Sequence, residues 1–100
     1  MINIPEKRIP THPGEILKEE FLGPLGISQM NLASALHLPY QRINEITNQK
    51  RGITPATALR LSKYFNTTPG FWMNLQLRWE LYHALKKEGK ELEKIEAKFR

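Results

Sequence analysis

Amide-bearing and cationic side chains are concentrated between residues 40 and 51. Gln41, Asn44 and Asn48 recur there at intervals of three and four residues, so a helix would carry them on one outer face. Asn and Gln are the side chains that can bond adenine at two points through the major groove of duplex DNA. The types and spacing of these residues therefore indicate contact with nucleic-acid bases.

A first helix, over residues 28–36, precedes this stretch. Ser28 is a favourable N-cap, and Ile27 before it can pack on Leu32 as a hydrophobic staple. Leu32 and Ala33 then begin one apolar stripe. These features predict a short amphipathic helix immediately before the amide-rich segment.

A second helix is predicted over residues 39–47, beginning at Pro39. Burial of Ile43 and Ile46 would turn the polar side chains outward. Those expected on the outer surface are Tyr40, Gln41, Arg42, Asn44, Glu45 and Asn48. A helix, a short turn and a second helix with such a face predict a helix-turn-helix, with double-stranded DNA as the first partner to consider.

The overall composition agrees with one small domain. The chain has 100 residues, of which 40% are hydrophobic, and this suffices for a modest core. It has no cysteine, so disulfides and thiolate metal sites are excluded, and a reducing cytoplasm is the expected compartment. No apolar run is long enough to span a bilayer, and residues 1–10 lack the apolar core of a signal peptide.

The positive charge is distributed unevenly along the chain. The formal net charge is +5, yet residues 1–38 contain more carboxylates than cations. Residues 39–63 have a single carboxylate, Glu45, and a clear excess of cations: Arg42, Lys50, Arg51, Arg60 and Lys63. Because this excess coincides with the helix-turn-helix, it favours a nucleic-acid partner over a merely solubilising charge.

The predicted fold class is all-α, with no pattern typical of strands. The expected organisation is an N-terminal arm over residues 1–11, a five-helix domain over 12–88 and a charged tail over 89–100. The first helix is expected to begin at His12-Pro13. The five helices are expected over residues 12–22, 28–36, 39–47, 55–65 and 69–87. We expect Gly23-Pro24 to end the first and Gly89 to interrupt the last, with a short charged helix around Leu92, Ile95 and Phe99.

No catalytic arrangement is evident. The chain has no glycine-rich phosphate loop, no nucleophile motif and no paired carboxylates positioned for acid–base chemistry. His12, His37 and His83 have neither metal-ligand spacing nor a matched carboxylate. We therefore expect a binding protein rather than an enzyme, without cofactor or metal.

Residues 11–82 resemble HigA-type antitoxins, within the Cro/repressor-like (XRE) helix-turn-helix proteins. The segments that carry the resemblance are His12-Pro13-Gly14-Glu15, Gly26-Ile27-Ser28-Gln29, Leu32-Ala33, Arg42-Ile43-Asn44-Glu45-Ile46, Arg51-Gly52-Ile53-Thr54, Thr57-Ala58-Leu59-Arg60-Leu61 and Thr68-Pro69 followed by Phe71-Trp72-Met73-Asn74-Leu75-Gln76. The resemblance implies a DNA-binding antitoxin that represses its own promoter and neutralises a HigB-type mRNA-cleaving toxin. His37 and Gln49 depart from it, since relatives usually have glycine in these turns, which often require a positive φ.

Each polar residue has an expected role. Gln41 is the best candidate for reading a base, and Tyr40 could pack on a thymine methyl or reach a phosphate. Gln29 begins the first helix of the motif, where its amide can bond a phosphate, and by resemblance it clamps the DNA backbone. By the same resemblance Asn48, Lys50 and Arg51 hold the sugar-phosphate backbone, although Asn48 could instead cap its helix.

Two residues have alternative interpretations. Arg42 could contact phosphate or guanine, or it could pair with Glu45 one turn on. Glu45 could accept a hydrogen bond from cytosine, or serve only as the partner of Arg42. The sequence leaves both alternatives open.

Two protein-binding surfaces are also expected. Trp72, Leu75 and Trp79 have helical spacing, and part of this apolar ridge is expected to face a second copy, as a homodimer reading an inverted-repeat operator would need. Glu15, Glu19 and Glu20 offer the better negative surface for a basic toxin, because the tail has mixed charge. The alternative functions are a solitary transcriptional regulator without a toxin and a protein-interaction module that uses the helix-turn-helix surface.

Overall fold

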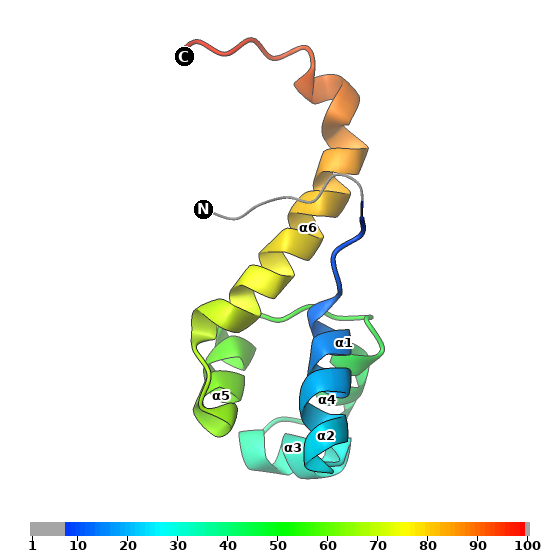
Figure 1. Ribbon diagram of the computed structural model, residues 1–100, viewed down its shortest axis with the longest axis vertical. Coiled ribbons are helices and arrows are strands. Elements are labelled where there is room, and N and C mark those ends of the chain that lie inside the picture. The colour runs from blue at the N-terminus through cyan, green and yellow to red at the C-terminus, as the bar shows by residue number, and fades with distance from the viewer. Residues whose placement is uncertain (1–7, 100) are drawn as a thin grey trace.

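The computed structural model describes residues 8–99, which form helices and no strand, so the predicted all-α fold is confirmed (Figure 1). Most of the expected arm, residues 1–7, lies outside the described range, as does Arg100. The elements are α1 (Pro13–Ile16), the π-helical η1 (Leu17–Leu22), α2 (Gly23–Leu25), α3 (Gln29–Leu36), α4 (Tyr40–Thr47), α5 (Pro55–Phe65) and α6 (Pro69–Leu92).

The first helical segment is longer than the sequence predicted. α1, η1 and α2 follow one another without a break, so the expected end at Gly23-Pro24 is wrong. The Gly23 N–H donates to the Lys18 carbonyl, five residues back, and this wider turn admits Pro24, which has no N–H of its own. The run ends instead at Gly26, whose φ of 65° is a left-handed conformation that glycine adopts at little cost.

The two helices of the motif and α5 match their predicted ranges to within a residue. The Ser28 hydroxyl accepts a hydrogen bond from the Asn31 N–H at 3.0 Å, which confirms it as the N-cap of α3. Thr54 caps α5 in the same way, accepting from the Thr57 N–H at 3.3 Å.

α6 runs through Gly89 to Leu92, so the predicted interruption is wrong. A glycine costs only about 1 kcal/mol in a helix interior, and the helix accommodates it. The separate charged helix expected beyond Lys90 is also wrong: after Leu92 the chain leaves the helix, and Ile95 and Phe99 are both exposed. Figure 1 shows α6 extending well beyond the other helices, and the molecule is accordingly elongated, 50 × 22 × 22 Å. No helix within residues 8–99 has the length and apolar character needed to cross a membrane.

Trp72 lies at the centre of the hydrophobic core, with 0% of its surface exposed. Its ring packs against Phe21 at a centroid distance of 4.9 Å, and its indole N–H donates to the Thr67 hydroxyl at 2.9 Å. The expectation that Trp72 faces a second copy is therefore wrong, because the five-helix domain is too small to fill its interior without this residue. Leu75 is partly buried against the same core.

Trp79 also turns toward its own domain. Its ring meets the edge of His12 at 4.9 Å and lies 4.3 Å from His83. The apolar side chains that α6 leaves exposed lie on other positions, notably Leu77 and Leu81, each 37% exposed.

The start of α1 packs directly on α4. Gly14 is buried so closely against the carbonyl of Ile46 that a β-carbon would overlap it. The His12 side chain caps this helix, its Nδ1 accepting from the Gly14 N–H at 2.9 Å. This contact, together with buried Ile43 and Ile46, fixes which face of α4 is turned outward.

Candidate nucleic-acid interface

α4 presents the polar face that the sequence predicted. Ile43 and Ile46 are fully buried, whereas Gln41 is exposed and Asn44 partly so. Among residues 8–99 the side chain of Gln41 has no hydrogen-bond partner, so both its amide oxygen and its amide nitrogen are available to a ligand. Arg42, partly buried, is likewise unpaired within that range.

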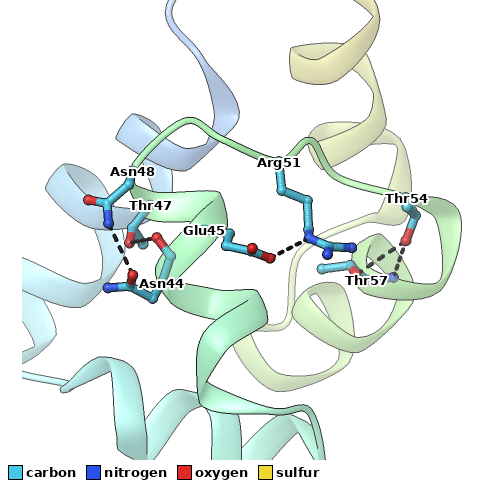
Figure 2. A network of polar contacts seen from close by, with 7 residues as sticks. All are labelled: Asn44, Glu45, Thr47, Asn48, Arg51, Thr54 and Thr57. Carbon is cyan, nitrogen blue, oxygen red and sulfur yellow. Dashed lines mark hydrogen bonds and ion pairs between the residues drawn. The ribbon is translucent and has the colours of Figure 1, made fainter.

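Asn44 connects the two helices of the motif. Its Nδ2 donates to Gln29 Oε1 at 3.0 Å and to the Tyr40 hydroxyl at 3.3 Å. Its Oδ1 accepts from Asn48 Nδ2 at 3.1 Å, a contact drawn in Figure 2. The structure thus brings Gln29, Tyr40, Asn44 and Asn48 together as one network, and Asn44 itself has little capacity left for a base.

Gln29 belongs to this network through its amide oxygen, and within residues 8–99 its two amide N–H donors stay free. Its oxygen is occupied by Asn44, which orients the amide and leaves the Nε2 hydrogens for an acceptor such as a phosphate oxygen. Gln29 is the first residue of α3, where unpaired backbone N–H groups add positive character. Asn48 is the C-cap residue of α4, and its side chain donates to Asn44.

The chain leaves α4 through a Schellman motif. The N–H of Lys50 donates to the Glu45 carbonyl at 2.8 Å, and that of Gln49 donates to the Ile46 carbonyl at 3.0 Å. Gln49 has φ 61° and His37, after α3, has φ 57°, which confirms that both turns need a left-handed residue. Asn66 is a third such position, at φ 55°, and its asparagine after a helix was a signal that the sequence analysis missed.

Glu45 pairs with Arg51 and not with Arg42. Arg51 Nε donates to Glu45 Oε1 at 2.9 Å, across the loop that follows α4 (Figure 2). The alternative in which Arg42 pairs with Glu45 is therefore wrong, because the turn at Gln49 brings the later arginine back over the helix. Lys50, beside it, is exposed.

Three residues that support this site were not identified from the sequence. Gln76, buried in α6, accepts a hydrogen bond from the Ile53 N–H at 2.6 Å, which anchors the loop after α4 to α6. Gly52 lies beside the same amide, in a space that a β-carbon would fill. Arg60 of α5 donates to the Leu36 carbonyl at 2.6 Å and to the His37 carbonyl at 3.2 Å, closing the end of α3. Nothing in the pattern distinguishes such anchoring residues from ordinary surface residues.

His12 is buried at the start of α1, whereas His37 and His83 are exposed. Burial lowers the pKa of His12 below its ordinary value of 6.5, although Glu15 acts in the opposite direction. Within the described part of the chain no three His, Asp or Glu side chains are grouped as a metal ion would require.

Comparisons with known proteins agree with this geometry. A helix-turn-helix family model matches residues 17–72. Virulence-associated protein I of Dichelobacter nodosus is 53% identical over 73 residues, which are 73% of this chain and 68% of that protein. The structure of the Pseudomonas aeruginosa antitoxin HigA with the higBA promoter has a TM-score of 0.85 at 43% identity, covering 90% of this chain and 99% of the other. An addiction module antidote protein of the HigA family from Coxiella burnetii gives a TM-score of 0.84 at 47% identity, covering 92% and 100%.

The fold, the outward polar face of α4 and the matched residues define a helix-turn-helix protein, a class of DNA-binding regulators rather than of enzymes. Within that class the chain belongs to the HigA antitoxin family, and the resemblance seen in the sequence is confirmed.

Proposed function

We propose that this protein is a sequence-specific DNA-binding antitoxin that represses its own operon. The observation that carries the proposal is the free, exposed amide of Gln41 on an α4 whose neighbouring amides are already held in a network. A rigid helix with one uncommitted bidentate amide is suited to reading an adenine in the major groove. The HigA of Pseudomonas aeruginosa, 43% identical, has been solved with its promoter, which supports the same partner here.

The other side chains of this face then divide by role. The phosphate contacts would come from Gln29, Asn48, Lys50 and Arg51, and such contacts fix register but carry no sequence information. Tyr40 and Arg42 flank the base-reading position on α4, where they can reach either a base edge or the backbone.

Gel-shift titration against the promoter of the protein's own operon tests this assignment. Gln41→Ala should weaken binding by about 1–3 kcal/mol and relax the preference at one base position. Lys50→Ala is the matched control, because loss of a phosphate contact should weaken all sequences alike and flatten the salt dependence. Unchanged affinity and preference in the Gln41 variant would refute its role, and absence of wild-type binding would favour a protein-interaction module instead.

We further propose that the protein acts as a homodimer on an inverted repeat. A two-fold pair of α4 helices would read half-sites about one helical turn, roughly 34–36 Å, apart. Because Trp72 is core and Trp79 packs on His12, the surface we favour for the second copy is the exposed apolar face of α6 around Leu77 and Leu81. Leu85, partly buried, extends this α6 face by one turn toward the C-terminus.

The proposed second partner is a HigB-type toxin. Glu15, Glu19 and Glu20 are all exposed on the first helical run, in a part of the chain without an excess of cations, and they offer a basic protein a negative surface. Reversing Glu19 and Glu20 to lysine should abolish toxin neutralisation in a growth assay while leaving promoter binding intact. Full neutralisation by that variant would exclude this surface, and failure of the wild type to rescue growth would indicate a solitary regulator.

A further inference from the structure

Glu45 is an unexpected residue on a face proposed to approach DNA. It is the one carboxylate in the sequence between Glu20 and Glu80, and it projects from the middle of α4. An isolated negative charge there would repel the phosphates that the neighbouring cations attract. Its surroundings in the structure account for its presence.

The main chain of Glu45 holds the start of the cationic loop. Its carbonyl accepts from the Lys50 N–H at 2.8 Å, which closes the end of α4 and is possible because Gln49 adopts a left-handed conformation. The loop is thereby folded back over α4, so that Arg51 comes next to the Glu45 side chain.

The side chain of Glu45 then holds Arg51 from one side only. The contact runs from Arg51 Nε to Glu45 Oε1 at 2.9 Å, while the terminal amino groups Nη1 and Nη2 have no partner among residues 8–99. Figure 2 shows them on the side of the guanidinium away from Glu45. A phosphate binds arginine well through such a pair of parallel N–H groups.

We infer that Glu45 is a positioning residue for DNA binding: it holds the Arg51 guanidinium in an orientation ready for a phosphate and reads no base itself. This inference rests on the proposed DNA-binding function. Its physical basis is that a long side chain loses rotamer freedom on binding, and one already oriented by a neighbour loses less. The pair also cancels the charge of Glu45, which removes the repulsion expected of a carboxylate near DNA.

A double-mutant cycle on the promoter duplex tests the inference. Glu45→Ala should weaken binding about three- to five-fold in the wild-type background, a range typical of exposed ion pairs, and should have no effect in an Arg51→Ala background. The promoter affinity of Glu45→Gln should lie between those of the wild type and Glu45→Ala, because the amide oxygen of glutamine can still accept from Arg51 Nε. The ranking of single-base operator variants should stay the same throughout, and circular dichroism should show each variant folded.

Three other results of the double-mutant cycle would each overturn the inference, and they can be told apart. If Glu45→Ala costs affinity equally with and without Arg51 and changes the preference at one base pair, Glu45 reads a base and the inference is overturned. If Glu45→Ala strengthens binding, the carboxylate acts by repulsion, and the inference is again overturned. Wild-type binding without any coupling between the two positions defeats this inference alone, whereas a wild type that does not bind the promoter defeats the proposed function with it.

Discussion

Gly14 packs against the main-chain carbonyl of Ile46, and the space between them excludes even a methyl group. This contact joins the N-terminus of α1 to the buried side of α4. The orientation of the proposed DNA-reading helix is therefore set by a glycine more than 25 residues away in the sequence. The contact also explains two residues of the His12-Pro13-Gly14-Glu15 segment. His12 caps α1, and Gly14 lets the start of α1 pack closely on α4.

Gly14→Ala should accordingly destabilise the fold by about 2 kcal/mol or more, because the added methyl must displace backbone rather than a flexible side chain. Gly89→Ala is the matched control, since it lies inside α6 with no atom within 4 Å of the added carbon. It should raise stability by about 0.5–1 kcal/mol. Urea titration followed by circular dichroism measures both, and equal stabilities for the two variants would contradict the close contact.

His12 should make stability depend on pH. Burial holds the pKa of its imidazole below 6.5, the ordinary value that applies in the unfolded chain, so the unfolded state takes up a proton first as pH falls. The contribution of neutral His12 to the stability of the fold is fully present above about pH 7. It is lost progressively as pH falls below 6.5 toward the pKa of His12 in the folded state. Comparison of urea midpoints at pH 7.5 and 5.5 should show a smaller loss in His12→Asn, which can still cap α1 but does not titrate. An identical loss in the two proteins would show that other groups carry the dependence.

The sequence predicted what depends on local patterns and missed what depends on packing at a distance. The cap at Ser28 and the spacing of Ile43 and Ile46 were enough to locate α3 and α4, because caps and apolar periodicity act within one helix. The turn at Gly23-Pro24 was misjudged because the wider turn of η1 absorbs the proline.

In the candidate site, too, the local pattern was predicted and the packing between distant residues was not. The outward face of α4 could be predicted from its two buried isoleucines, but the partner of Glu45 could not. Whether Arg42 or Arg51 reaches Glu45 is decided by the left-handed turn at Gln49, and that geometry has no signature in helical spacing. Trp72 was misplaced for a related reason: its spacing on α6 indicates a face, and only the assembled domain shows what covers that face.

Gln76 should link the stability of the fold to DNA binding. Gln76→Leu would leave the buried N–H of Ile53 without an acceptor, which typically costs about 1–3 kcal/mol. The loop that carries Lys50 and Arg51 would also lose its anchor to α6, so promoter affinity should fall even at temperatures where the variant is fully folded. Gln76→Glu retains an acceptor oxygen but buries a carboxyl group, so it should recover promoter affinity more than stability. Loss of stability without loss of affinity would mean that the loop is held by other contacts.

The two sides of α6 should respond differently to an introduced charge. Leu81 is 37% exposed and Leu77 beside it equally so, whereas Trp79 packs on His12. Leu81→Glu should therefore give a folded monomer, because a charge at the centre of a two-fold apolar contact meets its own copy across the axis. Trp79→Glu should instead lower the melting temperature, since it removes the ring that covers the start of α1. Light scattering and thermal unfolding, measured on both variants and on the wild type, separate the two effects. A Leu81→Glu protein that is folded and still dimeric would exclude this face of α6 as the contact between copies.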